Sequence, residues 1–274
     1  MSVKYSFIGV GNMASAIIRA MDSLEGKIIT EHCDIYLYDK MNIKTDEYKK
    51  QGYKIAISID ECVKETKYIF LCVKPQNYRE VLEYIKNNNI SLAGKVIISV
   101  AAGISTSQIT DCLGCECAVI RTMPNTPMTI GEGVTAICKN SHVESRDFER
   151  VCRIFSAKSE LMVLDQSQMN NIIGITSSSP AYVYKFIDAL YESAISQGLD
   201  SPKLLEAICK VMIGSAKMVL SSECDIKDLI SAVRSPNGTT ERALNVLDDR
   251  QFDKMINDAV RACNERADTL GEEM

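Results

Sequence analysis

The stretch YSFIGVGNMASAIIRAM (Tyr5–Met21) decides the fold of this chain. An apolar run leads into a glycine-rich turn, and the apolar residues after the turn have helical spacing. In this strand–turn–helix context, a G-x-G-x-x-A motif is typical of a dinucleotide-binding unit. Gly9 allows the tight turn, Gly11 lets the backbone approach a pyrophosphate, and Ala14 permits close packing of the helix on the strand. The stretch therefore predicts a bound dinucleotide, with a tight turn that holds no ligand as the alternative.

The residues after this turn and after the next apolar run bear on which dinucleotide binds. Backbone N–H groups of Asn12 and Met13 would face the phosphates at the positive end of the helix. Asp39 would bind the ribose 2′-hydroxyl of NADH and repel the 2′-phosphate of NADPH. It lies further from the glycines than the usual spacing of about 20 residues, which fits an insertion around Gly26–His32. Lys40 could still attract a 2′-phosphate, and Asp39 could instead cap the next segment, so both cofactors stay open and NADH is favoured.

Short apolar runs alternate with helical patterns over the first part of the chain. This order is typical of an open parallel sheet with right-handed crossovers, the Rossmann-type doubly wound fold of the α/β class. The expected strands are Lys4–Ile8, Asp34–Tyr38, Lys54–Ile57, Tyr68–Val73, Lys95–Val100, Cys117–Thr122, Gly133–Cys138 and Leu161–Leu164. The expected helices between them are Asn12–Leu24, Ile43–Gln51, Gln76–Asn87, Ser105–Leu113 and Val143–Ser156.

The pattern changes after about Asp165, where strand signals stop and long helical patterns begin. We therefore expect a dinucleotide-binding domain over residues 1–164 and an all-α dimerisation and substrate domain over residues 165–274. Ser201 ahead of Pro202 predicts a helix start. The long apolar faces indicate burial against a second copy of the chain, with a self-contained bundle as the alternative. The expected helices are Pro180–Gln197, Ser201–Ser221, Gly238–Leu247 and Phe252–Leu270.

The composition argues against several classes of partner. The 274 residues carry a net charge of −5 without a long run of Lys or Arg, which disfavours a nucleic-acid partner. No apolar stretch reaches the roughly 18–20 residues that cross a membrane. The 11 cysteines are an odd number and predict reduced thiols in a cytoplasmic protein. Cys112, Cys115 and Cys117 lie close together, but no second set completes four ligands, so we expect no metal.

Further motifs follow the expected strands at their carboxyl ends, where open α/β sheets bind ligands. They are CVKPQ (Cys72–Gln76), SVAAG (Ser99–Gly103) and RTMPNTP (Arg121–Pro127). The small residues 101–103 favour close approach of a flat group such as nicotinamide. In the helical half, VRSPNGTT (Val233–Thr240) precedes a helix start, whose N–H groups and hydroxyls could hold a carboxylate. A capped turn between helices is the alternative there.

In this order the motifs resemble those of the pyrroline-5-carboxylate reductase family, over nearly the whole chain. The resemblance extends to SSSPAYVY (Ser177–Tyr184), GSAKMVL (Gly214–Leu220) and SPNGTTERAL (Ser235–Leu244). The last of these is similar to the family's S-P-G-G-T-T signature. The resemblance implies that NAD(P)H reduces the C=N bond of 1-pyrroline-5-carboxylate and that L-proline is formed. It also implies a homodimer with interlocked helices, and in many members a pentamer of such dimers.

The resemblance further implies roles for particular residues. Thr240 would sit near the ring nitrogen and relay a proton, and Glu223 would help to fix the ring amine. The substrate would be bound by Val233, Ser235, Gly238, Thr239 and Thr240. Besides Gly9 and Gly11, the cofactor would contact Val10, Asn12, Met13, Asp39, Val73, Lys74, Ala102 and Asn125. A protonated imine accepts hydride without a metal or a histidine acid, so the protein mainly positions two reactants.

Departures from the family pattern leave alternatives open. Arg234 stands where a small residue is usual, and its charge could strengthen carboxylate binding or change the substrate. Asn237 stands where the family has glycine, but Asn tolerates positive φ better than most residues. Ser178 and Ser179 replace part of a glycine-containing turn. The alternatives are a reductase of a related cyclic imine and a cofactor-binding regulatory protein without catalysis.

Overall fold

The structure is a computed structural model that describes residues 3–24, 34–41 and 45–273. The chain divides into two compact units, Met1–Ser178 with Ala262–Met274 and Ser179–Arg261. This division falls after the expected boundary at residue 164, because the segment after the last strand and the end of the last helix pack with the sheet. The expected insertion at Gly26–His32 and the expected helix start at Ile43 lie outside the described residues.

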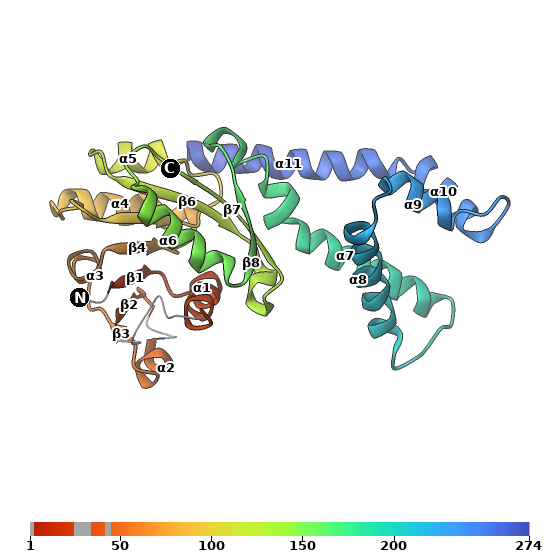
Figure 1. The fold of residues 1–274 in the computed structure, drawn as a ribbon, viewed down its shortest axis with the longest axis horizontal. Coiled ribbons are helices and arrows are strands. Elements are labelled where there is room, and N and C mark those ends of the chain that lie inside the picture. The colour runs from red at the N-terminus through yellow and green to blue at the C-terminus, as the bar shows by residue number, and fades with distance from the viewer. Residues whose placement is uncertain (1–2, 25–33, 42–44, 274) are drawn as a thin grey trace. The chain divides into compact units, whose positions relative to one another are not determined.

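A twisted sheet forms the centre of the first unit (Figure 1). In the described residues its strand order is β3-β2-β1-β4-β5-β6-β7-β8. This order confirms the predicted Rossmann-type doubly wound sheet. The strands are β1 (Tyr5–Ile8), β2 (Ile35–Tyr38), β3 (Lys54–Ile55), β4 (Tyr68–Leu71), β5 (Val96–Ser99), β6 (Ala118–Pro124), β7 (Gly133–Lys139) and β8 (Ser159–Val163).

One strand pair departs from the expected parallel arrangement. All neighbouring strands run parallel except β6 and β7, which pair antiparallel, with Thr122 opposite Ile137. Only residues 125–132 join these two strands, and a parallel crossover needs a dozen residues or more. The prediction of a wholly parallel sheet is therefore wrong at this pair.

Helices cover both faces of the sheet (Figure 1). Adjacent residues of one strand enter different cores, as Ile69 and Phe70 of β4 do, so both faces of the strand are apolar. The helices are α1 (Asn12–Asp22) and α6 (Ser145–Ser156) on one face, and α3 (Ile59–Glu65), α4 (Tyr78–Asn87) and α5 (Thr106–Leu113) on the other. The other elements are α2 (Thr45–Lys50), the 3₁₀ turns η2 (Pro75–Asn77), η3 (Thr126–Ile130) and η4 (Gln166–Gln168), and the π-helix η5 (Ile173–Ser177).

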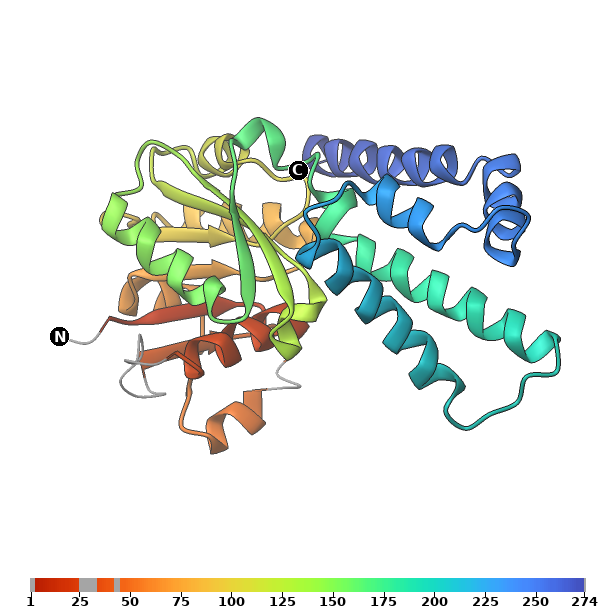
Figure 2. The ribbon, with the colours of Figure 1, turned by 45° about the vertical axis from the view of Figure 1, so that its right-hand side comes forward.

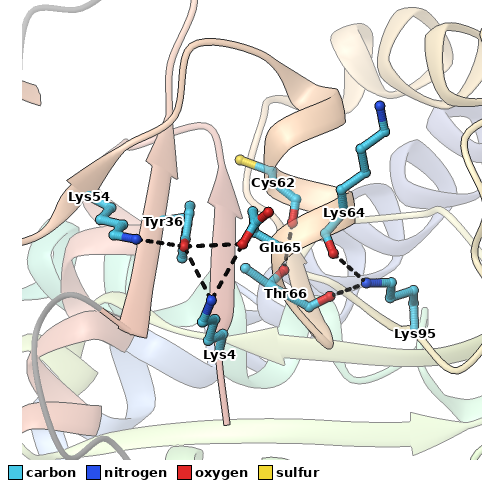
Figure 3. A network of polar contacts seen from close by, with 8 residues as sticks. All are labelled: Lys4, Tyr36, Lys54, Cys62, Lys64, Glu65, Thr66 and Lys95. Atoms are coloured by element: carbon cyan, nitrogen blue, oxygen red, sulfur yellow. Dashed lines mark hydrogen bonds and ion pairs between the residues drawn. The ribbon is translucent and has the colours of Figure 1, made fainter. Parts of the chain in front are cut away.

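Helix α3 has no counterpart among the helices expected from the sequence. Ser58 caps it by accepting a hydrogen bond from the N–H of Glu61 at 3.2 Å. At its other end, Glu65 joins a polar network in which the Tyr36 hydroxyl accepts from Lys54 at 2.9 Å (Figure 3). This network joins α3 to β2 and β3, and the candidate site lies elsewhere, at the carboxyl ends of the parallel strands β1–β6.

The second unit contains helices and no described strand. Helices α7 and α8 lie side by side (Figure 2). The prediction of a helix start at Ser201 is wrong, because α8 begins at Leu204 and Ser201 forms the turn before it, where its hydroxyl accepts from the Lys203 N–H. Helix α9, capped by Asp225, was not expected from the sequence. The helices are α7 (Ser179–Ser196), α8 (Leu204–Ser221), α9 (Ile226–Val233), α10 (Thr239–Asp249) and the first part of α11 (Phe252–Glu272).

Candidate active site

The residues predicted to bind the cofactor follow five neighbouring strands of the sheet. Strands β2, β1, β4, β5 and β6 are adjacent and parallel, so their carboxyl ends meet at one edge. The strand order reverses between β1 and β4, and open α/β sheets bind ligands at such a point. The structure therefore places at one edge Gly9, Val10, Gly11, Asn12 and Met13 after β1, Asp39 after β2, Val73 and Lys74 after β4, Ala102 after β5 and Asn125 after β6.

The two glycines of the β1–α1 turn have different surroundings. Gly9 has φ +92°, and a Cβ atom there would lie 2.8 Å from the Cys72 carbonyl carbon and the Val73 nitrogen. Its N–H donates to the Tyr38 carbonyl at 2.8 Å. A Cβ atom at Gly11 would meet nothing within 4 Å. Gly9 therefore lets the turn approach β4, whereas the space beside Gly11 is open to a ligand.

The amino end of α1 fits a phosphate group. Gly11 is the N-cap residue, and no side chain caps the helix by hydrogen bonding to its first turn. The first turn also contains no acidic residue. Helix N-termini carry a partial positive charge and attract anions. The residues present therefore fit the pyrophosphate of a dinucleotide.

Asp39 organises the turn in addition to its predicted role with the ribose. One carboxylate oxygen accepts the N–H of Val10 at 2.7 Å, and the other accepts the N–H of Met41 at 2.9 Å. The second contact agrees with the alternative that Asp39 caps the segment after β2. Lys40, the other residue considered for cofactor choice, forms an exposed ion pair with Glu80 at 2.9 Å.

Tyr78 supports this edge of the sheet, although the sequence analysis did not single it out. It is fully buried, and its hydroxyl donates to the Leu71 carbonyl at 2.5 Å and shares a hydrogen bond with the Ser99 hydroxyl at 3.1 Å. The Val100 N–H donates to the same oxygen at 3.3 Å. Burial raises the pKa of Tyr78, so the hydroxyl stays protonated. Tyr78 therefore holds the ends of β4 and β5 together. In the sequence, the one indication of this role was an aromatic residue in the first turn of an expected helix.

The small residue Gly103 in the loop after β5 makes room for α11, whereas the sequence analysis expected small residues there to make room for nicotinamide. Gly103 has φ +80°, and a Cβ atom there would collide with the backbone of Ala267 in α11. A Cβ atom at Gly271 of the same helix would likewise collide with the Gly103 carbonyl oxygen. Ala102 packs against the apolar cluster that contains Ala267 and Met123. The close approach of α11 thus requires glycine at position 103. Contact between Ala102 and the cofactor stays a prediction.

Asn125 and Arg121 fix the end of β6 through hydrogen bonds. The Asn125 side chain donates to the Thr176 carbonyl at 3.0 Å and accepts the Val134 N–H at 2.9 Å. Arg121 is buried and donates to Asn170 at 2.5 Å. A charged residue within an apolar strand could have indicated this structural role of Arg121. The sequence analysis named Arg121 only as the first residue of the RTMPNTP motif. Both residues position the backbone that the cofactor is predicted to contact.

The predicted substrate residues of the second unit gather at the turn between α9 and α10. Ser235 accepts the N–H of Gly238 through its carbonyl at 2.9 Å, and Asn237 has φ +56°. Asn237 thus takes the left-handed conformation that a glycine would take, so the turn survives the substitution. Gly238 is the N-cap of α10, without a capping side chain, and Thr239 and Thr240 open the helix. This amino end therefore offers N–H groups and two hydroxyls.

Two of the predicted substrate residues do not lie within this turn. Val233, the last residue of α9, is 68% exposed. Glu223 precedes α9 and is exposed, so α9, about 12 Å long at 1.5 Å per residue, lies along the chain between it and the α10 turn. The role of Glu223 beside Thr240 stays a prediction.

No alternative metal or membrane site emerges from the described residues. Their His, Cys, Asp and Glu side chains form no group of three or more that could hold a metal ion. Cys112, Cys115 and Cys117 are free thiols, and burial raises the pKa of Cys117 to about 12. Within residues 3–24, 34–41 and 45–273, no helix has the length and apolar character to cross a membrane.

Comparison with known proteins finds a different family model for each half of the chain and relatives of one family over its whole length. The model for pyrroline-5-carboxylate reductase dimerisation matches residues 166–270, and the model for coenzyme F420-dependent NADP oxidoreductases matches residues 4–103. Pyrroline-5-carboxylate reductase from Escherichia coli is 32% identical over 276 residues, covering 99% of this chain and 100% of the relative. The enzyme from Synechocystis is 31% identical over 282 residues, covering 99% and 100% of the two chains.

Solved structures agree with these relatives over the same length. A pyrroline carboxylate reductase from Plasmodium falciparum with NADP bound superposes with a TM-score of 0.88 at 27% identity, covering 98% of each chain. The 1-pyrroline-5-carboxylate reductase from Streptococcus pyogenes also gives 0.88, at 26% identity, covering 97% of this chain and 98% of the other. The similarity therefore spans both units.

Proposed function

This chain belongs to the pyrroline-5-carboxylate reductase family, and we propose that it reduces the C=N bond of 1-pyrroline-5-carboxylate to give L-proline. The observation that carries the proposal is the uncapped amino end of α10 with Thr239 and Thr240, in a chain similar to these reductases from end to end. NADH or NADPH, when bound, supplies the hydride. The chain's own residues bind, orient and protonate the imine.

The substrate's carboxylate is held at the amino end of α10. N–H groups there, together with the hydroxyls of Ser235 and Thr239, are suited to an anionic group. Thr240 lies near the ring nitrogen and relays its proton, and Glu223 fixes the ring amine. Because the protonated imine is already electrophilic, these residues act mainly by orientation, which can lower a barrier by several kcal/mol.

We place the cofactor at the carboxyl edge of the sheet, with NADH preferred. The Asp39 carboxylate lies beside the β1–α1 turn, where it would repel a 2′-phosphate. Lys40 is paired with Glu80, so its charge is partly balanced. A comparison of kcat/KM for NADH and NADPH tests the preference, and a higher value for NADPH would reject it.

The reaction is tested by following NADH and NADPH oxidation with 1-pyrroline-5-carboxylate as substrate. Thr240→Ala is expected to lower kcat/KM by about a hundredfold or more, the usual contribution of a positioned proton-transfer group. Glu223→Ala is expected to lower it by at least about tenfold, the loss of one hydrogen bond to a charged group. Thr110→Ala on α5, a half-buried threonine like Thr240, and Glu206→Ala on α8, an exposed glutamate like Glu223, remove similar groups elsewhere and should leave kcat/KM unchanged. Turnover of the six-membered cyclic imine alone, or cofactor binding without turnover, would contradict the proposal.

We further propose that the enzyme is a cytoplasmic homodimer that assembles into a pentamer of dimers. The dimerisation model that matches residues 166–270 supports the dimer. In the second unit, α7, α9 and α10 have no buried residue, as expected of helices that pack against another copy. The free thiols suit a reducing compartment.

A further inference from the structure

The turn before α10 contains an ion pair between Arg234 and Glu241. Both Nε and Nη2 of Arg234 lie 3.3 Å from one carboxylate oxygen of Glu241. The other oxygen accepts the N–H of Asn237 at 2.8 Å. The side chains of Arg234 and Glu241 are 43% and 26% exposed, so the pair is partly shielded from water. One carboxylate thus binds both a cation and the backbone of the turn.

Glu241 places a negative charge at the amino end of α10, where the carboxylate of the proposed substrate would also lie. It is the third residue of α10 and lies in the first turn, whose partial positive charge attracts anions. Two carboxylates at one helix end repel each other unless a cation lies between or beside them. Arg234 is the residue in contact with Glu241 that carries such a charge.

We propose that Arg234 is a positioning residue that neutralises Glu241 and so keeps the amino end of α10 able to accept the substrate's carboxylate. This inference rests on the proposed function. Arg234 acts through Glu241 rather than by touching the substrate. The pair also holds Glu241 over the N–H of Asn237, the residue in the left-handed conformation, and so fixes the turn.

Two other roles for Arg234 make different predictions. If Arg234 bound the substrate's carboxylate directly, its loss would weaken binding whether or not Glu241 carried a charge. If the pair were only structural, loss of both charges would damage the turn at least as much as loss of one. Of the three roles, only neutralisation of Glu241 predicts that removing the Glu241 charge restores the substrate binding lost with Arg234.

The test measures KM and kcat for 1-pyrroline-5-carboxylate in wild type, Arg234→Met, Glu241→Gln and the double variant. Gln can still accept the Asn237 N–H, so the turn keeps that contact. Arg234→Met should raise KM about three- to tenfold with kcat changed by less than about twofold, the size expected for two like charges about 4 Å apart in a water-like dielectric. Glu241→Gln should lower KM by about two- to threefold, because the Arg234 charge is then unbalanced.

The double variant should return KM to within about twofold of wild type, and about 0.5 M salt should shrink the Arg234→Met effect by screening. Arg250→Met, at the carboxyl end of the same helix, is the matched control for net charge and should leave KM unchanged. An unchanged KM in Arg234→Met, or a double variant as impaired as Arg234→Met, overturns the inference.

Wild-type turnover separates this inference from the proposed function. Absence of turnover in the wild type rejects the proposed reaction whatever the variants do. Calorimetric titration of the same four proteins with L-proline, which carries a carboxylate on a ring of the same size, then tests by itself whether Arg234 neutralises Glu241. The same order of affinities supports it, and equal affinities or no binding in all four proteins reject it.

Discussion

Gly9 and Gly11 are two residues apart, yet a methyl group would meet different surroundings at each. At Gly9 it would meet the backbone of β4's end in a conformation that side chains rarely adopt. At Gly11 it would enter open space beside an uncapped helix end. The first glycine therefore serves the fold, and the second serves the proposed pyrophosphate.

Substitution with alanine should separate these two roles. Gly9→Ala should lower the free energy of unfolding by about 1–3 kcal/mol, the cost of a strained backbone position, and should also weaken cofactor binding. Gly11→Ala should unfold like wild type but bind NADH more weakly, because the methyl group occupies the ligand's space. Urea denaturation and fluorescence titration with NADH measure the two effects. Equal stability of the two variants would show that the close approach at Gly9 is unimportant.

At this scale the sequence predicts the glycines better than the side chains. The motif spacing predicted the tight turn at Gly9, which its φ of +92° confirms, and the open space beside Gly11 agrees with the predicted approach of a pyrophosphate. The bond from Val10 to Asp39 requires β2 to lie beside β1, which local spacing does not encode. Tyr78 reaches two strand ends through its hydroxyl, and a tyrosine in a first helical turn carries no signal for such a contact.

Helix α11 ends against the loop after β5, and backbone contacts there require glycine. Gly103 and Gly271 allow the helix and the loop to approach more closely than any side chain would permit. Gln108 of α5 donates to the Gly271 carbonyl at 2.6 Å and so holds the helix end. The final turns of α11 are therefore part of the first unit rather than a loose terminus.

Gly103→Ala should release this helix end. The variant should lose more stability than Gly94→Ala, because both residues have positive φ but only Gly103 has a backbone neighbour at that position. Strain alone costs about 1–3 kcal/mol, and the displaced helix should add about as much again. Hydrogen exchange should accelerate in residues 262–272 of Gly103→Ala only. Identical exchange in both variants would mean that the helix end does not depend on this contact.

The elements that the sequence analysis missed carry weak local signals of different kinds. Helices α3 and α9 have seven and eight residues, so each presents barely two turns of apolar spacing. The antiparallel pairing of β7 was encoded in the short connection at residues 125–132, which the apolar pattern of the strand does not reveal. Long, strongly periodic elements such as α8 were predicted because many residues repeat one signal.

The whole molecule leaves much apolar surface exposed on its second unit. Val211 and Met218 of α8, seven residues apart on one face of the helix, are 63% and 58% exposed. A soluble monomer rarely exposes a broad apolar patch of this kind. The sequence predicted a second copy from these apolar faces, and their exposure in the described helices is in keeping with the dimerisation model that matches this part of the chain.

Charges on this face should weaken the assembly. Val211→Lys with Met218→Lys should shift the sedimentation mass towards the monomer at micromolar concentration, because two buried charges cost several kcal/mol at an interface. Ile57→Lys with Ile130→Lys, at residues 90% and 78% exposed in the first unit, is the matched control and should keep the wild-type mass. An unchanged mass in the α8 variant would exclude this face from the interface.

The second unit is inserted, along the chain, between the two parts of the first. A ribosome makes residues 1–178 and then the second unit before it reaches residues 262–273, and domains generally fold as units in the order of synthesis. The surface around Gly103 and Met123 that receives α11 therefore stays uncovered until the second unit has been made. The unit whose synthesis begins first is completed only after the other.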